Sequence, residues 1–510
     1  MLKMWIAAAG VGTLVGCTAD DARALISVSE EAAGENCANG GTRIDVGVDK
    51  DDSDSLDAAE VDSTSFVCNG ESGTNGVNGE NGANGEDGVD GQEALVEIEA
   101  VDPGAECPFG GFRVETGLDD NGDGVLDDNE VTDRQLVCEN NTVRIATFNT
   151  SLNRSSAGEL IKNLTGTMDP QAQQVAEIIQ TVRPDVLLIN EFDYDATQPM
   201  MAADLFRTNY LEMSQNGRDP ITYPYAYVAP SNTGVDSGVD FDGDGNLGGL
   251  NDAFGFGFFE GQFAMVVFSR YEIDVAAVRT FQTFRWQDMP GALLPDDPST
   301  PEPNDYYSTE ALDVFRLSSK SHWDVPIQLG DRTVHFLTSH PTPPVFDGPE
   351  DRNGTRNHDE IRFWVDYVDS TASSYIYDDV GVMGGLASGE AFVVAGDLNS
   401  DPADGDSVPG AANQLLDSPF VNGDNPPSSL GGPEQALVQG DINDVHISDP
   451  AFDTADFGDS APGNLRVDYV VPSADLVVVD QGVFWPPSTD PTFPLVASSD
   501  HRLVYIDVLP

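Results

Sequence analysis

The sequence predicts an α/β protein whose large C-terminal domain consists of two packed sheets with helices outside, preceded by a small disulfide-bonded repeat region and a stalk. Three observations lead to this prediction. Apolar strand-like runs alternate with helical patterns and long loops from Val143 to the C-terminus. Two cysteine pairs with equal spacing precede that stretch. A strict Gly-x-y run lies between the two pairs.

The composition limits the classes of protein to consider. Of 510 residues, 88 are Asp or Glu and 23 are Lys or Arg, which gives a formal net charge of -65. The 39% hydrophobic content is enough for a large core, so wholesale disorder is excluded. Such an acidic surface repels phosphate backbones, which argues against a tight nucleic-acid-binding module. It does not argue against an enzyme whose metal ions supply positive charge locally.

The N-terminus has the pattern of an export signal. A basic start and a short apolar stretch in residues 1–16 are followed by Cys17. The run Leu14-Val15-Gly16-Cys17 resembles a bacterial lipobox, which implies lipid attachment to Cys17 and an exported bacterial lipoprotein. Thr18 rather than Asp follows the cysteine, so we expect the outer membrane or the cell surface. The alternative is an ordinary export signal with an incidental cysteine.

Residues 17–140 divide into a linker, two modules and a stalk. The interval from Cys37 to Cys68 equals that from Cys107 to Cys138, and both intervals place glycines at the same positions. In an exported chain this repeat predicts one disulfide in each module. Glycine recurs every third residue from Gly70 to Gly91 without proline, which is typical of either a weak collagen-like helix or a flexible stalk. The predicted segments are an acidic linker (17–36), module 1 (37–68), the stalk (69–94) and module 2 (95–140).

Module 2 contains a loop that matches a twelve-residue calcium-binding pattern. Its oxygen-bearing residues are Asp119, Asn121, Asp123, Asp127 and Glu130, with Gly124 at the turn. The alternative is an acidic solvated loop. Module 1 has Asp54 in place of the turn glycine, so its calcium pattern is weak. A third loop begins at Asp240 but has Asn251 at the twelfth position, which favours an acidic insertion.

The domain from 143 to 510 has clear helix and strand patterns. Asp169-Pro170 is an N-cap followed by a first-turn proline, and apolar residues then recur at helical spacing until Val182. A second helix is predicted from Asn357. The predicted strands are 143–149, 186–189, 264–269, 334–339, 392–395, 467–471 and 503–508.

Polar residues lie beside many of these strands, where rigid strand ends converge on one rim. Each alone has an ordinary explanation as a cap or a structural histidine. Together they form a candidate active site: Asn149, Glu191, His340, Asp397, Asn399, Asp468, Asp500 and His501.

The order of these motifs resembles the endonuclease/exonuclease/phosphatase superfamily, the fold of deoxyribonuclease I, apurinic endonucleases, sphingomyelinases and inositol-polyphosphate phosphatases. The matching motifs include Ser339-His340-Pro341, Gly396-Asp397-Leu398-Asn399, Arg466-Val467-Asp468-Tyr469 and Ser499-Asp500-His501-Arg502. The resemblance implies a four-layer α/β/β/α sandwich over residues 143–510. Two further segments, 316–326 and 351–357, are similar to an exported bacterial branch often labelled phytase-like.

The resemblance also implies roles. Glu191 and Asn149 would hold Mg²⁺, or Mn²⁺ or Ca²⁺ in its place, and Asp500 would complete this metal site or a second one. Asp397 would orient and deprotonate the attacking water while Asn399 donates to a phosphate oxygen. His501, paired with Asp468, and His340 would lie on either side of the phosphorus. Which histidine is acid and which is base stays open.

A basic cluster stands out in this acidic domain. Arg352 and Arg356, with Asn357 beside them, are predicted to bind substrate phosphate. Salt bridges on a helix surface are the alternative.

The leading hypothesis is an extracytoplasmic, lipid-anchored, metal-dependent phosphoesterase of phosphodiesterase or nuclease type. Its expected partners are a phosphoester substrate, with nucleic acid bound transiently, and the membrane through the lipid anchor. No obligate protein partner is evident. The alternatives are a phosphomonoesterase acting on inositol phosphate or similar esters, and a non-catalytic calcium-binding surface adhesion protein.

Overall fold

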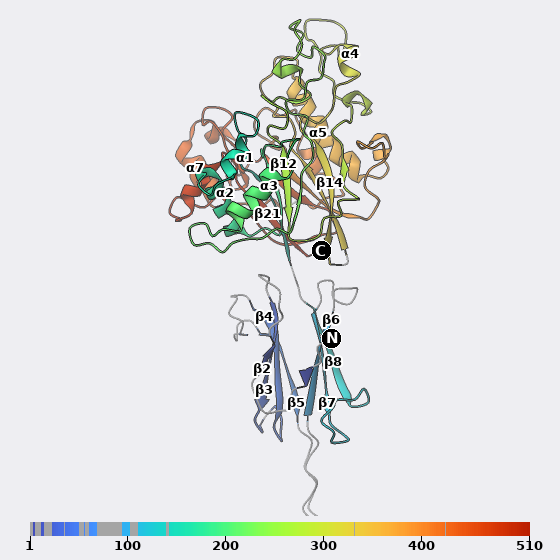
Figure 1. The fold of residues 1–510 in the computed structure, drawn as a ribbon, viewed down its shortest axis with the longest axis vertical. Helices are drawn as coiled ribbons and strands as arrows, with labels where there is room; N and C mark the ends of the chain where they lie inside the picture. Colours follow the sequence, from blue (N-terminus) through green and yellow to red (C-terminus); the bar gives the residue numbers. More distant parts are fainter. Residues whose placement is uncertain are drawn as a thin grey trace, which may run out of the picture. The chain divides into compact units, whose positions relative to one another are not determined.

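The chain divides into two units, residues 1–141 with 330–332, and residues 142–329 with 333–510. In the second unit the computed structural model describes all residues except 424 and 510. In the first it describes residues 4–5, 12–14, 23–34, 36–49, 56, 61–68, 94–101, 111–138, 330 and 332. Within these described ranges we find no helix whose length and hydropathy suit a membrane span. Figure 1 shows the ribbon of each unit.

The second unit contains a six-stranded sheet that carries β9 and β10 at its centre. These two strands are parallel, and β21 runs antiparallel to β9. Asn149 of β9 lies opposite Asn190 of β10, so both strands end at the same edge. In spatial order the strands are β11 (Tyr225–Tyr227), β12 (Met265–Ser269), β10 (Val186–Asn190), β9 (Val143–Asn149), β21 (Val504–Leu509) and β20 (Val477–Val483).

A five-stranded sheet faces the first one through contacts of its β16 with β9 and β10. Its β15 and β16 are parallel, whereas β19 is antiparallel to β16. The spatial order is β13 (Arg279–Thr280), β14 (His322–Leu329), β15 (Arg332–Ser339), β16 (Ala391–Asp397) and β19 (Asp468–Pro472). A separate two-stranded sheet consists of β17 (Ala455–Asp456) and β18 (Asn464–Leu465).

Helices cover the outer faces of both sheets. Val175 and Ile179 of α2 pack in one core with Phe148 of β9, and Ile361 and Trp364 of α5 pack in another with strands of the second sheet. The four-layer α/β/β/α fold is therefore confirmed. The α-helices are α1 (Glu159–Leu164), α2 (Pro170–Val182), α3 (Met201–Phe206), α4 (Thr309–Leu312), α5 (Arg352–Val368), α6 (Asn413–Leu416) and α7 (Gly431–Gln439). The shorter helical turns are η1 (Arg207–Leu211), η2 (Leu250–Asp252), η3 (Trp286–Asp288), η4 (Ser373–Tyr375), η5 (Asp441–Val445), η6 (Pro450–Phe452) and η7 (Phe493–Ser498).

Local chemistry explains where α2 begins and ends. The Asp169 side chain accepts a hydrogen bond from the backbone N–H of Ala172, and Pro170 occupies the first turn, as predicted. Arg183 adopts the left-handed conformation and ends the helix. The predicted start of α5 at Asn357 is wrong, because the helix begins at Arg352. Its first turn contains Gly354, whose poor helix propensity hid the start.

The first unit contains two four-stranded sheets with the same internal register. Gly41 lies opposite Cys68 in one sheet, and Gly111 lies opposite Cys138 in the other. Cys37 and Cys68 form a disulfide with a Cα–Cα distance of 5.1 Å. The strands are β2 (Gly12–Leu14), β3 (Arg23–Glu31), β4 (Gly41–Asp49) and β5 (Val61–Cys68), and β1 (Met4–Trp5), β6 (Ala94–Val101), β7 (Gly111–Leu118) and β8 (Val131–Cys138).

Several predictions fall outside the described residues. These include lipid attachment at Cys17, the Gly-x-y stalk through residue 93, Cys107 and the side chain of Cys138. Lipidation, the stalk conformation and the second disulfide therefore stay predictions.

Candidate active site

The two facing sheets bring the predicted polar residues to one rim. Asn149 ends β9 and Asp397 ends β16, while Asp468 begins β19 directly opposite Asp397. His340 follows β15, and His501 precedes β21. Asp468 and His501 therefore lie at the starts of antiparallel strands, which reach the same rim as the carboxyl ends of the parallel ones.

Two residues fix the strands that carry this rim. A Cβ added to Gly396 would lie 2.0 Å from the carbonyl oxygen of Ser339, so β15 and β16 approach too closely here for any residue but glycine. Asn190 is fully buried between the sheets, where it accepts from the N–H of Asp397 at 3.3 Å and donates to the carbonyl of Ser339 at 3.4 Å. These contacts hold Asp397 and His340 in place.

Asp397 is the centre of the site. One oxygen, Oδ2, accepts a hydrogen bond from Nδ2 of Asn149 at 3.0 Å. The same oxygen lies 3.4 Å from Nε2 of His340 and 3.6 Å from Nε2 of His501. The other oxygen, Oδ1, accepts from the backbone N–H of Asn399 at 2.9 Å. The side chains of Asn149, His340 and His501 thus meet at one oxygen of Asp397.

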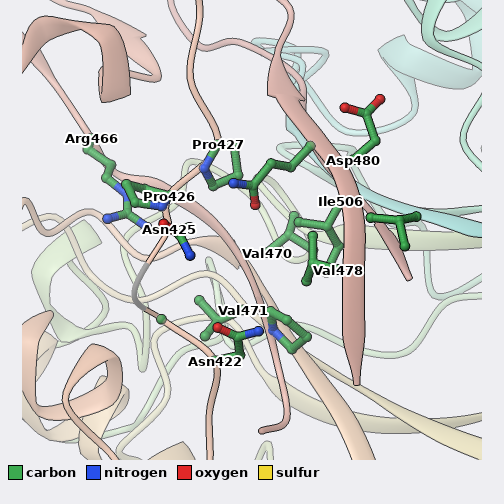
Figure 2. Close-up of a pocket in the computed structure, with 14 residues that line it drawn as sticks. Asn422, Asn425, Pro426, Pro427, Arg466, Val470, Val471, Val478, Asp480 and Ile506 are labelled. Atoms are coloured by element: carbon green, nitrogen blue, oxygen red, sulfur yellow. The ribbon is translucent and has the colours of Figure 1, made fainter. Parts of the chain in front are cut away.

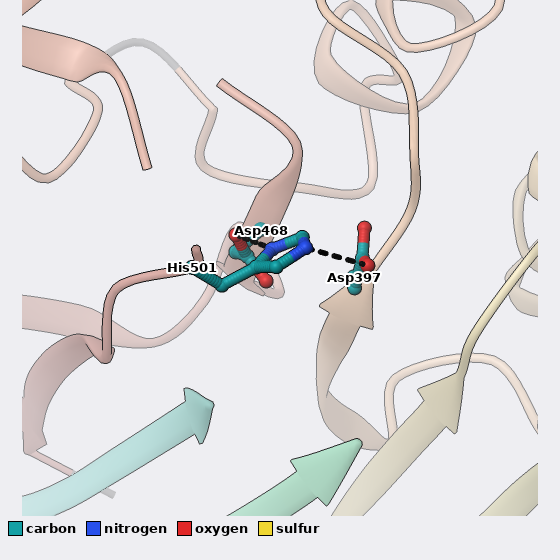
Figure 3. A group of neighbouring side chains, drawn as sticks. All are labelled: Asp397, Asp468 and His501. Atoms are coloured by element: carbon teal, nitrogen blue, oxygen red, sulfur yellow. Dashed lines mark hydrogen bonds and ion pairs between the residues drawn. The ribbon is translucent and has the colours of Figure 1, made fainter. Parts of the chain in front are cut away.

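A chain of hydrogen bonds extends behind His501. Its Nδ1 lies 2.9 Å from Oδ2 of Asp468, as Figure 3 shows. That oxygen also accepts from the hydroxyl of Thr454 at 2.9 Å. Asp468 and His501 are both buried. Because Nδ1 is hydrogen-bonded to Asp468, Nε2 of His501 is the ring nitrogen that faces Asp397.

The two histidines have opposite electrostatic surroundings. Burial opposes a charge on His501, but Asp468 and Asp397 outweigh it and raise the pKa of His501 to about 10. Burial holds the pKa of His340 well below its ordinary value, and the nearby charges of Lys320 and His501 lower it further. The site therefore contains one imidazolium and one neutral imidazole at neutral pH.

Asp397 itself is ionised at neutral pH. Its burial and the charge of Asp468 raise its pKa to about 6, and His501 and Asn149 limit the rise. A carboxylate with a pKa near 6 is a suitable general base.

A set of oxygen ligands lies next to Asp397. Glu191 follows β10 in a left-handed conformation with φ 59°, and its Oε2 accepts from Nδ2 of Asn153 at 2.6 Å. Burial, Asp397 and Asp500 raise the pKa of Glu191. Asp500 is exposed and accepts from the Ser151 hydroxyl at 3.1 Å.

These residues fit a hard divalent cation. Glu191 and Asp500 supply carboxylate oxygens, and Asn149 and Asn153 supply amides. The mutual repulsion of the carboxylates of Glu191, Asp397 and Asp500 is the kind that a bound cation relieves. Ligand atoms of Asp397, Asp468 and His501 also lie within 4.8 Å of one another. We favour Glu191 as the metal ligand, because the His501–Asp468 atoms already share a hydrogen bond.

The sequence did not single out three residues of the site. Asn153 contacts Glu191, Thr454 contacts Asp468, and Lys320 is a buried lysine whose charge acts on His340. Lys320 exposes 7% of its surface, and its Nζ lies 3.4 Å from the carbonyl oxygen of Pro341. All three are on loops, where no periodicity marks them. Lys320 does belong to the 316–326 segment noted in the sequence.

The residues predicted to bind substrate, Arg352, Arg356 and Asn357, all make structural contacts. The buried Arg356 guanidinium donates to the carbonyls of Leu317, Phe254 and Arg316. Buried Asn357 donates to the carbonyls of Thr342 and Leu398, both at 2.8 Å, so it holds two loops of the site. Arg352 pairs with Glu350. Substrate binding by these three residues stays a prediction.

The predicted calcium loop of module 2 is compact and lies between β7 and β8. Asp119 accepts from the backbone N–H groups of Gly122, Asp123 and Gly124, and Asn121 accepts from that of Asp123. Glu130 accepts from those of Asp120 and Asp127 at 3.0 Å each. Calcium binding here stays a prediction.

A pocket of about 380 Å³ lies away from this rim, between β19 and β20. Figure 2 shows Asn425, Pro427, Val470, Val478 and Asp480 around it. None of the site residues described above lines it. We therefore place the chemistry at the rim.

Comparisons with known proteins find similarity in both units of the chain. Residues 24–68 and 93–138 each match a domain of unknown function (DUF7151). No curated protein matches the chain. Among solved structures, an endonuclease/exonuclease/phosphatase from Beutenbergia cavernae DSM 12333 is 17% identical, with 72% of this chain and 71% of that one covered and a TM-score of 0.38.

Two further solved structures are similar. Sphingomyelinase C from Streptomyces griseocarneus is 14% identical, with 72% of this chain and 99% of that one covered and a TM-score of 0.36. A Staphylococcus aureus beta toxin mutant with bound magnesium ions is 14% identical, with the same coverage and a TM-score of 0.35. A family model matches residues 146–501, more than half of the chain. The chain therefore belongs to the endonuclease/exonuclease/phosphatase family.

Proposed function

We propose that this chain is a metal-dependent phosphoesterase that cleaves phosphodiesters by attack of water on phosphorus. The observation that carries the proposal is the meeting of His340, His501 and Asn149 at one oxygen of Asp397. The family includes metal-dependent phosphodiesterases, nucleases and sphingomyelinases. Hydrolysis of a phosphoester is therefore the reaction that we assign to these residues.

Each residue has a role that follows from its charge. Asp397 takes a proton from the attacking water, because its pKa of about 6 leaves it ionised at neutral pH. The His501 imidazolium, held by Asp468, stabilises the negative charge that develops on the phosphoryl oxygens and donates a proton to the leaving oxygen. The neutral His340 orients the water through Nε2, the ring nitrogen that faces Asp397.

Glu191, Asn149 and Asp500 would hold a divalent cation, with Asn153 orienting Glu191. Such a cation neutralises phosphate charge and stabilises the leaving group when it is bound. In a domain this acidic, the cation also offsets the repulsion between protein and substrate.

We also propose that the protein acts outside the cytoplasm on a lipid anchor at Cys17. The support is the lipobox-like sequence and the disulfide between Cys37 and Cys68, since such bonds persist in oxidising compartments.

The proposal is tested with bis-p-nitrophenyl phosphate and p-nitrophenyl phosphate, each with Mg²⁺, Mn²⁺ or Ca²⁺ and with EDTA. We expect hydrolysis of the diester that EDTA abolishes. Turnover should rise as pH passes about 6, where Asp397 loses its proton, and fall as pH approaches 10, where His501 does. Preference for the monoester would favour a phosphomonoesterase. Absence of hydrolysis of either ester with every metal would contradict the proposal.

A further inference from the structure

Exposed phenylalanine rings gather on the loops next to the catalytic rim. Among the described residues of the second unit, the exposed phenylalanines are Phe256, Phe258, Phe346 and Phe420. The first two lie on the loop that precedes β12, and Phe346 lies on the loop that follows β15 and His340. An exposed ring gains little from folding, so its place beside a site calls for another explanation.

The loop that carries Phe256 and Phe258 belongs to the rim. It leads into β12, which runs antiparallel to β10 with Met265 opposite Asn190. Glu191 directly follows Asn190 at the end of β10. The start of β12 and the loop before it therefore lie at the sheet edge that carries Glu191.

Buried glycines alternate with exposed rings in this loop. Gly255 and Gly257 are buried, whereas Phe256 and Phe258 expose 52% and 63% of their surfaces. A Cβ added to Gly255 would lie 1.8 Å from the carbonyl oxygen of Ser319, so the backbone packs here too closely for any other residue. The glycines hold the segment against the protein while both rings stay in solvent.

One end of the segment is bound on the His340 side of the site. Gly255 contacts Ser319, which directly precedes Lys320. Nζ of Lys320 lies 3.4 Å from the carbonyl oxygen of Pro341, the residue after His340.

The other end is bound on the Glu191 side. The backbone N–H of Phe258 donates to Oε1 of Gln262 at 2.8 Å, and Nε2 of the buried Gln262 donates to the carbonyl oxygen of Arg154 at 2.7 Å. Arg154 follows Asn153, whose side chain donates to Glu191 at 2.6 Å. The loop is thus tied to both sides of the site.

The two exposed rings contact each other edge to face. Their centroids are 5.6 Å apart and their planes lie at 79°. The pair offers a ring face and a ring edge at fixed positions, which suits a further planar aromatic group. We infer that Phe256 and Phe258 form a subsite for a planar aromatic substituent of the phosphodiester. The inference rests on the phosphoesterase function proposed above.

The position of the rings favours the substrate as their occupant. A phosphodiester whose phosphorus lies at Asp397 carries two organic substituents, and these extend from the rim over the adjoining loops. With 88 Asp or Glu against 23 Lys or Arg, the chain has few cations to hold an anionic substrate, whereas an apolar contact meets no charge repulsion. Because the loop is bound at both ends, the rings lose little conformational entropy on binding.

Binding of two phosphonates to the full chain tests the subsite without reference to activity. Phenylphosphonate and methylphosphonate share one anionic head, and both have a carbon–phosphorus bond in place of the ester bond. With Ca²⁺ present, calorimetry should show that the phenyl compound binds about tenfold more tightly, as expected for one added aromatic contact. The double variant Phe256→Ala/Phe258→Ala should lose most of this preference and keep its affinity for methylphosphonate.

The controls use the same residue type. Phe420 exposes 40% of its surface, and its carbonyl accepts from the N–H of Ala474, beyond the end of β19 that is opposite to Asp468. Phe420→Ala should therefore keep the wild-type preference. Phe258→Tyr retains the aromatic ring and should keep it as well.

The two proposals fail in different ways. A wild-type chain that binds neither phosphonate would overturn the proposed function of the site, and the subsite with it. Equal affinity of the wild type for both phosphonates would overturn the subsite alone. So would a double variant that keeps the wild-type preference. If that variant also lost adsorption to phosphatidylcholine vesicles, the rings would be assigned to a lipid surface instead.

Discussion

His340 and His501 approach the same oxygen of Asp397 from different sheets, yet their surroundings give them opposite charge. Behind His501, the ring nitrogen Nδ1 is bonded to Asp468, which is bonded in turn to Thr454. Behind His340, the corresponding Nδ1 is buried without a hydrogen-bond partner, and the charge of Lys320 is close by. The comparison teaches that burial favours the neutral form of both rings, and that Asp468 behind His501, together with Asp397, reverses this effect for His501 alone.

The largest loss should follow removal of the shared carboxylate. Asp397→Asn keeps the shape of the side chain but removes both the base and the charge that the two rings face. We expect turnover to fall by about 10³-fold or more, in line with the upper part of the range for a general base. The thermal midpoint without metal should not fall, because burial disfavours the charge of Asp397 by more than His501 and Asn149 favour it, as its raised pKa shows. Steady-state assays and calorimetry measure both, and wild-type turnover would contradict the assignment.

Separate removal of the two histidines tests directly whether they have different roles. We expect His501→Ala and His340→Ala each to reduce turnover by about 10²-fold or more. His501→Ala should cost more, because it also removes the positive charge. The double variant should lose much less than the product of the single losses, since the two rings act on one phosphoryl group.

The relative size of these losses decides the roles. A larger loss from His340→Ala than from His501→Ala would contradict the imidazolium role of His501. Asp468→Asn is the companion variant. It should lower turnover by weakening the action of His501, because the ring loses the carboxylate that supports its charge.

A variant of Lys320 tests the electrostatic surroundings of His340. Lys320→Met keeps the length of the buried side chain and removes its charge. We expect the pKa of His340 to rise toward its ordinary value, because one of its two charged neighbours is gone. Turnover should fall by about tenfold, less than for loss of a general acid or base. The imidazole of His340 can be followed by NMR, with Lys162→Met as the surface control. An unchanged His340 pKa would show that Lys320 does not act on this ring.

Thr454→Val should have the smallest effect. The variant removes a hydroxyl that donates to Asp468 and accepts from two backbone N–H groups. We expect a loss of about 1–3 kcal/mol in unfolding free energy, because buried groups are left unpaired. Turnover should fall less than tenfold, with the Asp468–His501 hydrogen bond weakened but present. Chemical denaturation measures the first quantity, and Thr454→Ser, which keeps the hydroxyl, should restore it.

Much of the fold was predictable because its elements follow regular patterns. The strand Val143–Asn149 and the helix Pro170–Val182 agree with the predicted bounds, since their apolar periodicity and caps are strong. The start of α5 was not predictable, because Gly354 and the polar residues around it resemble a loop. The burial of Arg356 was not predictable for a related reason. Sequence alone does not show that a basic residue is buried among backbone carbonyls.

The candidate site was predictable only in part. The strands and motifs identified Asp397, His340 and His501, whose positions follow from strand ends. Asn153, Lys320 and Thr454 lie on loops, so their proximity to the site depends on how those loops fold over the rim. Asn153 and Thr454 orient carboxylates of the site, and the charge of Lys320 lowers the pKa of His340.

The most direct test of the two-histidine account is an NMR titration of the histidine side chains in the full chain. Assignment uses His340→Gln and His501→Gln, which remove one signal each. The account predicts that His501 stays protonated until pH approaches about 10, and that His340 is already neutral below its ordinary titration range. Two rings that both titrate near pH 6.5, or a His340 that is protonated at neutral pH while His501 is not, would contradict it.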